Sequence, residues 1–167
     1  GVWALLYAMD FFLPTARQRW WSFAAVVAAV PLTLLAIVIK PLLPFPEVPS
    51  ALRALAGTPL AILSNGSPRM LEGAVRSSGL DGVFAHVLSV DAVAVYKPSP
   101  RVYDLAPQAL EVEPAEILFV SSNGWDVAGA AAFGFRTCWC NRANAPAEEL
   151  EATPDYEVDR LDAIADK

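Results

Sequence analysis

Residues 117–142 read ILFVSSNGWDVAGAAAFGFRTCWCNR, and this stretch decides the fold class. Its apolar beginning predicts a buried strand over 116–120, and the polar residues 121–126 predict a loop. The small residues of 127–134 predict a helix, and a second strand is expected over 136–140. A strand, a loop, a helix and a further strand in this order are typical of a parallel sheet covered by helices. We therefore expect an α/β fold.

The same alternation extends in both directions from this stretch. We expect helices over 51–56, 68–78 and 100–110, strands over 59–63 and 83–90, and a final strand or helix over 156–164. The short apolar strands are typical of parallel sheets, which are buried on both faces. The functional site of such a sheet lies beyond the carboxyl ends of its strands. The polar clusters 64–67 and 121–126 are expected at that edge.

The first 43 residues differ in composition from the rest. Residues 22–39 (SFAAVVAAVPLTLLAIVI) carry no charge, and four prolines follow within 41–50. An apolar run of this length predicts a transmembrane helix, with a buried cap or core helix, or an altered or truncated N-terminus, as the alternatives. We expect an atypical segment over 1–43 and a core domain over 44–167.

Charge and cysteine usage restrict the function classes. The net charge is −6, and the 12 Lys and Arg residues are scattered, which argues against nucleic-acid binding. Cys138 and Cys140 lie two apart on an expected strand, where they are poorly placed to bridge each other. We expect two buried free thiols and hence a reducing compartment, the cytoplasm. Anchoring to a membrane through 22–39 is the alternative.

Two of the expected loops carry polar groups that could bind an anion. Ser64 and Asn65 follow a strand and precede a helix, so backbone N–H groups and their side chains could face a negatively charged ligand. Turn formation and helix capping explain the same residues equally well. Ser121, Asn123 and Asp126 follow the next strand, and packing alone does not explain so many polar groups there.

A lysine and two aromatic residues complete the candidate site. Lys97 lies in an apolar loop, where it either reaches solvent or meets a carboxylate such as that of Asp126. Tyr103, one to two turns later, faces the same site or lies half-buried on a helix surface. Trp125 either walls an apolar pocket or anchors the core.

Three strings in this order resemble one family. LAILSNGSPRMLE (60–72), LSVDAVAVYKPSPRVYDLA (88–106) and residues 117–142 are similar to the haloacid dehalogenase superfamily, and specifically to its (S)-2-haloacid dehalogenase branch. The resemblance covers about residues 44 to 164. It implies a Rossmann-like parallel sheet with flanking helices, the haloacid dehalogenase-like core, with the family's cap domain largely missing.

The resemblance also implies a reaction and roles for the residues. An Asp carboxylate displaces the halide of an (S)-2-haloacid, and water hydrolyses the resulting aspartyl ester to an (R)-2-hydroxy acid. The implied catalytic residues are Lys97, Asp126, Ser121, Asn123 and Tyr103, and the implied substrate-binding residues are Ser64, Asn65 and Trp125. No cofactor and no metal are expected, because Ser122 stands where phosphatases of the superfamily carry a second acid for magnesium. The implied partners are a small haloacid and a second copy of the chain.

The chain departs from the family at its beginning. The family's nucleophile lies in an Asp-x-x-x-Thr motif, but Thr15 follows Asp10 by one place too many, and the substrate-binding Arg has only Arg17 or Arg19 as a match. A fragment of a longer enzyme, an altered N-terminus and a non-catalytic remnant all explain this. The alternative functions are therefore an inactive or membrane-attached domain of this fold and, less well supported, a phosphatase.

Overall fold

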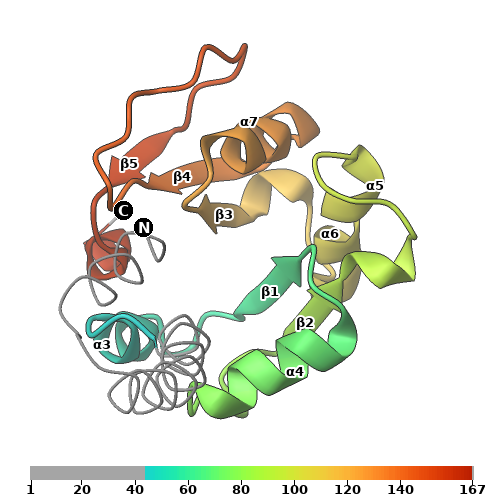
Figure 1. Ribbon diagram of the computed structural model, residues 1–167, viewed down its shortest axis with the longest axis vertical. Helices are drawn as coiled ribbons and strands as arrows, with labels where there is room; N and C mark the ends of the chain where they lie inside the picture. Colours follow the sequence, from blue (N-terminus) through green and yellow to red (C-terminus); the bar gives the residue numbers. More distant parts are fainter. Residues whose placement is uncertain (1–43, 167) are drawn as a thin grey trace, which may run out of the picture. The chain divides into compact units, whose positions relative to one another are not determined.

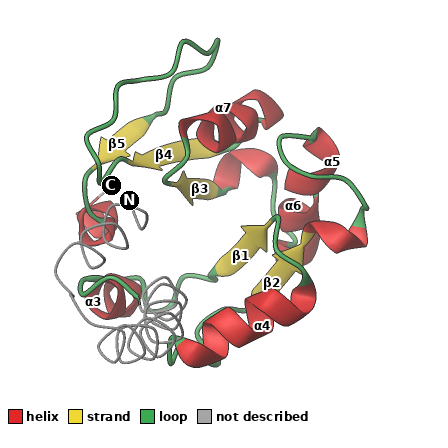
Figure 2. Cartoon of the chain, viewed as in Figure 1, coloured by secondary structure: helices red, strands yellow, loops and turns green. Residues whose placement is uncertain are grey.

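The computed structural model describes residues 44–166, which fall within one compact unit, Pro44–Lys167 (Figure 1). Helices and strands alternate along this part of the chain (Figure 2). Its α-helices are α3 (Val48–Ala54), α4 (Pro68–Ser77), α5 (Pro100–Tyr103), α6 (Leu105–Leu110) and α7 (Gly124–Phe133). Its strands are β1 (Ala61–Ser64), β2 (His86–Ser89), β3 (Leu118–Ser121), β4 (Arg136–Cys140) and β5 (Tyr156–Val158). Short 3-10 helices are η2 (Val90–Ala92), η3 (Pro114–Glu116) and η4 (Leu161–Asp166).

The strands form two parallel sheets in the described part of the chain. β1 pairs with β2, and the second sheet has the order β3-β4-β5. Every pair is parallel, with Ser64 opposite Ser89 and Ser121 opposite Trp139. α7 packs against β3 and β4, whereas α4 packs against β2 and α6 against β1 and β2 (Figure 1). The expected α/β class with parallel strands and flanking helices is therefore confirmed.

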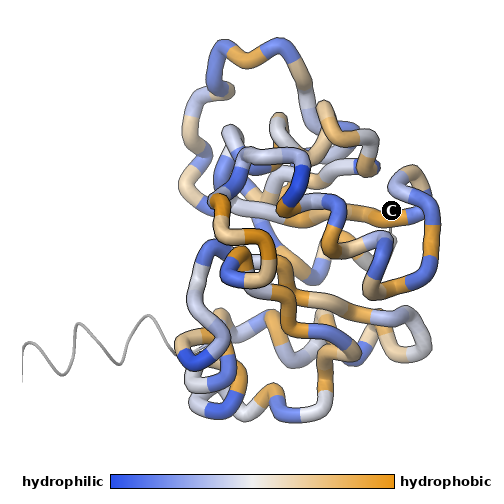
Figure 3. Tube along the Cα trace, turned by 90° about the vertical axis from the view of Figure 1, so that its right-hand side faces the viewer, coloured by the Kyte–Doolittle hydropathy of each residue, from blue (hydrophilic) through white to orange (hydrophobic). Residues whose placement is uncertain are grey.

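The number of neighbours of a strand decides how deeply it is buried. β4 pairs on both sides, and Thr137–Cys140 are buried. Within residues 44–166, β1 and β3 each pair on one side, and all four residues of each are only partly buried. Apolar parallel strands normally have both faces and both edges covered. Hydrophobic residues are frequent along the strands, whereas the loop from β4 to β5, at the top of Figures 1 and 3, carries many hydrophilic ones.

An aromatic cluster joins the helices to the strands. Tyr103 of α5 is fully buried and packs against Phe119, Phe133 and Phe135, with ring centroids 5.8, 6.0 and 6.1 Å away. Burial of such rings stabilises the fold by roughly 1.5–3 kcal/mol for each fully buried side chain. A second cluster contains Cys138 and Cys140, which are buried and form no disulfide with each other, as predicted.

The expected single helix over 100–110 is wrong, because α5 ends at Tyr103 and α6 begins at Leu105. Pro107 has no N–H group, so it cannot donate the i to i−4 hydrogen bond to the carbonyl of Tyr103. The break therefore falls one turn before the proline. Tyr103 consequently ends a short helix.

Other boundaries move by a few residues. The first helix begins at Val48 rather than at Ala51, with Pro49 in its first turn, where a missing N–H costs nothing. Ser50 does not cap it, and its hydroxyl donates to the carbonyl of Glu47. The strand expected over 83–90 is limited to β2, since a turn around Gly82 (φ +75°) precedes it. The final segment contains both a strand, β5, and a helix, η4.

Several predictions concern residues outside the described ones. These are the transmembrane helix over 22–39, the cap remnant and the roles of Asp10, Arg17 and Arg19. The domain division at 43/44 also stays a prediction. Within residues 44–166, no helix is long and apolar enough to cross a membrane.

Two helical glycines give a matched prediction about packing. A Cβ atom at Gly129 in α7 would lie 2.5 Å from Tyr103 Oη and 2.9 Å from Pro98 Cβ, whereas one at Gly73 in α4 would meet no atom within 4 Å. We expect Gly129→Ala to lower the free energy of unfolding by about 1–3 kcal/mol through overpacking. Gly73→Ala should raise it by about 0.5–1 kcal/mol, because alanine favours helix. Urea unfolding measures both, and equal effects would contradict the close approach of α7 to Tyr103.

Candidate active site

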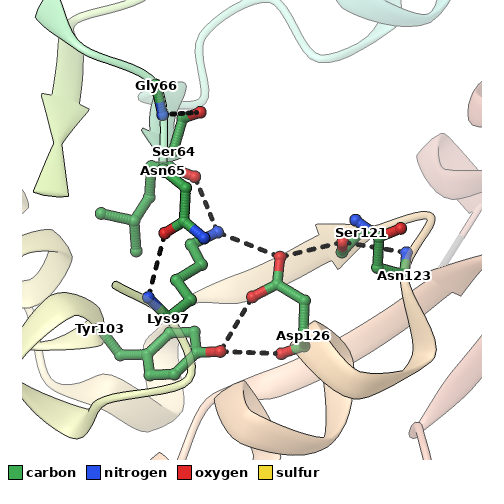
Figure 4. Close-up of polar contacts among 9 residues, drawn as sticks. Ser64, Asn65, Gly66, Lys97, Tyr103, Ser121, Asn123 and Asp126 are labelled. Atoms are coloured by element: carbon green, nitrogen blue, oxygen red, sulfur yellow. Dashed lines mark hydrogen bonds and ion pairs between the residues drawn. The ribbon is translucent and has the colours of Figure 1, made fainter. Parts of the chain in front are cut away.

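A buried ion pair forms the centre of the candidate site. Lys97 Nζ lies 3.1 Å from Asp126 Oδ2, and the two side chains are 6% and 7% exposed (Figure 4). Lys97 Nζ also donates to the carbonyl of Leu63 at 2.8 Å. The partner predicted for Lys97 is therefore present, and the alternative of a solvated loop lysine is wrong. The pair connects the loop after β2 to the beginning of α7 and to β1.

Tyr103 contacts Asp126, the acidic member of this pair. Its hydroxyl lies 2.9 Å from Asp126 Oδ1 and 3.2 Å from the carbonyl oxygen of the same residue. The side chain is fully buried, so the alternative of a half-buried tyrosine on a helix surface is wrong. One carboxylate oxygen of Asp126 thus accepts from a tyrosine and the other from a lysine, which fixes the rotation of the carboxylate.

The loop after β3 supplies further contacts to the same carboxylate. Ser121 Oγ donates to Asp126 Oδ2 at 3.1 Å, and the backbone N–H of Asn123 donates to Ser121 Oγ at 3.2 Å. Asn123 precedes α7 and is exposed. Sequence reasoning missed Trp139 of β4, whose Nε1–H donates to the carbonyl of Ser122 at 3.1 Å. Only its register opposite Ser121 could have indicated this contact.

The turn after β1 lies on the other side of Lys97. Ser64 Oγ accepts a hydrogen bond from the N–H of Gly66 at 3.1 Å. Asn65 Oδ1 accepts one from the backbone N–H of Lys97 at 3.0 Å. The structure therefore brings the turn after β1 into direct contact with the loop after β2 (Figure 4). Asn65 is exposed.

Trp125 differs from the other predicted residues in its surroundings. It lies in the first turn of α7, directly before Asp126, and 38% of its surface is exposed. The alternative that it anchors the core is therefore wrong. Its expected role as the wall of an apolar pocket stays a prediction.

The electrostatics of the centre follow from its burial. Loss of water lowers the pKa of Lys97, while the charge and the hydrogen bond of Asp126 raise it. Burial raises the pKa of Tyr103, and its hydrogen bond to Asp126 and the negative charge there raise it further. Tyr103 therefore remains protonated and acts as a donor. Lys97 Nζ also lies 4.8 Å from the centroid of the Phe119 ring, whose π face stabilises a cation.

This arrangement is able to hold a negative charge. A cation, a tyrosine hydroxyl and the hydroxyl of Ser121 contact one carboxylate, and Asn65 of the turn after β1 contacts the backbone of the lysine. Preorganised donors of this kind stabilise charge that develops on a reacting group. Among residues 44–166, no group of three or more His, Cys, Asp or Glu side chains is placed to hold a metal ion.

Comparison with known proteins identifies the family. The model of the haloacid dehalogenase-like hydrolases matches residues 10–134, which is more than half of the chain. The chain belongs to this family. As a haloacid dehalogenase-like hydrolase, it carries its polar centre where the loops after β1 and β3 and the loop before α5 meet.

Individual members of the family are closely similar to this hydrolase. It is 54% identical over 127 residues to (S)-2-haloacid dehalogenase of Pseudomonas sp. (strain YL), with 75% of this chain and 55% of that protein covered. It is 51% identical over 123 residues to haloacetate dehalogenase H-2 of Moraxella sp. (strain B), with 72% and 55% covered. The chain thus spans about half the length of the curated relatives that it matches.

A solved structure shows the same fold. The L-2-haloacid dehalogenase of Xanthobacter autotrophicus with chloropropionic acid covalently bound matches with a TM-score of 0.70 at 38% identity. The match covers 74% of this hydrolase and 60% of that chain. The haloacid dehalogenase-like fold expected from the three sequence strings is thereby confirmed.

Proposed function

We propose that this chain provides the core-domain half of the active site of an (S)-2-haloacid dehalogenase. The observation that carries the proposal is the buried Lys97–Asp126 pair, with Tyr103 and Ser121 donating to the same carboxylate. A lysine buried to this extent needs a paired anion, and Asp126 supplies it and orients the ammonium group. The similarity to an (S)-2-haloacid dehalogenase at 54% identity supports this substrate class.

The reaction consists of two displacements. An aspartate carboxylate oxygen attacks C2 of the haloacid, the carbon–halogen bond breaks, and halide leaves with the bonding electrons, so that C2 inverts. Water then attacks the carbonyl carbon of the ester, releases an (R)-2-hydroxy acid and regenerates the aspartate. The covalent chloropropionic acid in the Xanthobacter protein is in accord with such an ester. No cofactor takes part in this scheme.

The described residues with proposed roles come from three loops, those after β1, β2 and β3. Lys97, oriented by Asp126 and Tyr103, holds the nucleophilic carboxylate and stabilises its charge. Ser121 and Asn123 order this network and the attacking water. Ser64 and Asn65 bind the carboxylate and the halide of the substrate, and Trp125 shields the bound substrate from solvent. The nucleophile itself comes from outside residues 44–166, from Asp10 or from a second copy of the chain in a homodimer.

The proposal includes the setting of the protein. Two buried cysteines that form no disulfide with each other are in accord with a reducing compartment, so the proposal places the enzyme in the cytoplasm. The segment 1–43 and the core domain 44–167 are then the two parts of the chain. The partner is a small haloacid, and binding of nucleic acid is not expected at a net charge of −6.

Halide release tests the proposal. Purified protein is incubated with (S)-2-chloropropionate and, in parallel, with the (R) enantiomer, and chloride is measured by ion chromatography. We expect release from the (S) enantiomer alone and its loss in Asp10→Asn if Asp10 is the nucleophile. Folded protein that releases no chloride contradicts a dehalogenase activity of this chain, and hydrolysis of p-nitrophenyl phosphate with Mg²⁺ instead would favour the phosphatase alternative.

A further inference from the structure

Ser89 connects β2 to the turn that follows β1. It is the last residue of β2, lies opposite Ser64 in the parallel register and is 8% exposed. Its hydroxyl donates to the carbonyl of Gly66 at 2.7 Å and accepts from the N–H of Asp91 at 3.2 Å. A single buried hydroxyl thus spans two strands and reaches the backbone of the Ser64–Gly66 turn, which is distant in sequence.

The Ser64–Gly66 turn carries hydrogen-bond donors that remain for a ligand. Asn65 Oδ1 accepts from Lys97 N, so its amide NH₂, with two N–H donors, is turned away from that contact. Ser64 Oγ accepts from Gly66 N, and its own hydroxyl hydrogen is a further donor. The direction of these donors depends on the peptide planes of the turn.

Two contacts hold the Ser64–Gly66 turn in place. A Cβ atom at Gly66 would lie 3.0 Å from Leu71 Cδ2, so the turn already packs closely against α4. The carbonyl of Gly66 is held as well, because the hydroxyl of Ser89 donates to it. Without that donor, the carbonyl would be free to turn towards water and would carry the peptide plane with it.

We propose that Ser89 is a positioning residue that orients the Ser64–Gly66 turn for binding of an anion. The proposal rests on the proposed function for the identity of that anion, which is the carboxylate of a 2-haloacid or of its product. Ser89 touches neither the substrate nor Lys97 in this scheme. Its loss should weaken binding of the substrate in the ground state and the transition state alike, which raises KM and leaves kcat nearly unchanged.

The experiment compares three variants of the full chain. Ser89→Ala removes the donor, and Ser89→Thr retains it. Ser77→Ala serves as the control, because it removes an exposed serine-to-carbonyl hydrogen bond, to Ala74, within α4. Binding of (R)-lactate, the product expected from (S)-2-chloropropionate, is followed by amide chemical shifts, and KM and kcat are measured with (S)-2-chloropropionate. We expect Ser89→Ala to raise Kd and KM by about three- to tenfold, as the net strength of one hydrogen bond implies. Ser89→Thr and Ser77→Ala should stay close to the wild type.

Each outcome decides the proposal. An unchanged Kd and KM in Ser89→Ala overturns it, as does an equal loss in Ser77→Ala, which would indicate general destabilisation. If the wild type neither binds (R)-lactate nor releases halide, the proposed function fails, and the amide resonances of Asn65 and Gly66 then test the positioning by themselves. They should move in Ser89→Ala and not in Ser77→Ala, and unmoved resonances overturn the role of Ser89.

Discussion

Lys97→Ala is expected to reduce halide release from (S)-2-chloropropionate by about 10²- to 10³-fold, the cost of removing one donor that stabilises charge in a transition state. The same change leaves Asp126 buried without its cation, since both side chains are less than a tenth exposed. We therefore expect the free energy of unfolding to fall by about 3–5 kcal/mol. Chloride release and urea unfolding of the same preparation measure the two effects.

Two further variants separate loss of charge from loss of fold. Lys97→Met also leaves Asp126 unpaired, but it retains most of the side-chain length and therefore its packing. Its free energy of unfolding should fall less than that of Lys97→Ala, and it should still be inactive. Arg76→Ala removes a cation from the exposed pair with Glu72 and should change neither activity nor stability appreciably. Full activity in Lys97→Met would exclude a role for the ammonium group in the reaction.

Asp126→Asn is expected to produce a pH-dependent loss of stability. Asp126 raises the pKa of Lys97 through its charge and its hydrogen bond, and burial lowers it. Without the carboxylate, only the lowering by burial remains, so the pKa of Lys97 in the folded chain falls further below 10.5. Between that value and the pKa in the unfolded chain, the unfolded state binds more protons, and stability rises with pH. The variant should therefore lose the most stability at pH values below the pKa of Lys97 in its folded state, and the loss should shrink as the pH rises through that pKa.

Urea unfolding at several pH values measures this effect, and a ¹⁵N-detected titration of Lys97 Nζ gives its pKa directly. Asp162→Asn provides the control, because Asp162 pairs with Arg160 on the surface and its carboxylate has no buried partner to leave unpaired. A loss of stability in Asp126→Asn that is the same at every pH would mean that Lys97 keeps its proton without the carboxylate.

The fold class could be predicted because the strands are short, apolar and followed by polar turns. The strand over 136–140 was placed without error, and the helices that follow β1 and β3 were found from Pro68 and from the Gly/Ala-rich run. The break at Asp104 was missed, although Pro107 indicates it one turn later. The four-residue extent of β2 depends on pairing with β1, which no local pattern encodes.

That Lys97 meets a carboxylate could be predicted from the sequence, whereas the geometry of the polar cluster could not. Lys97 and Asp126 were paired because an apolar loop makes an unpaired lysine unfavourable, and the structure brings them together. The burial of Tyr103 could not be read from its surroundings in sequence, because it depends on α7 and on Phe119. Ser89 and Trp139 were missed because each contacts a backbone carbonyl across a strand pair, which leaves no pattern in the sequence.

Tyr103 belongs to two neighbourhoods at once, since its ring packs in the aromatic cluster and its hydroxyl contacts Asp126. A mutation that repacks Phe133 or Phe135 will therefore tilt a donor that orients the ion pair. During evolutionary divergence, substitutions in this aromatic core are therefore expected to change the activity as well. Laboratory selection for a new haloacid should accordingly accumulate changes in this aromatic interior, and selection for heat tolerance should alter catalysis as a side effect.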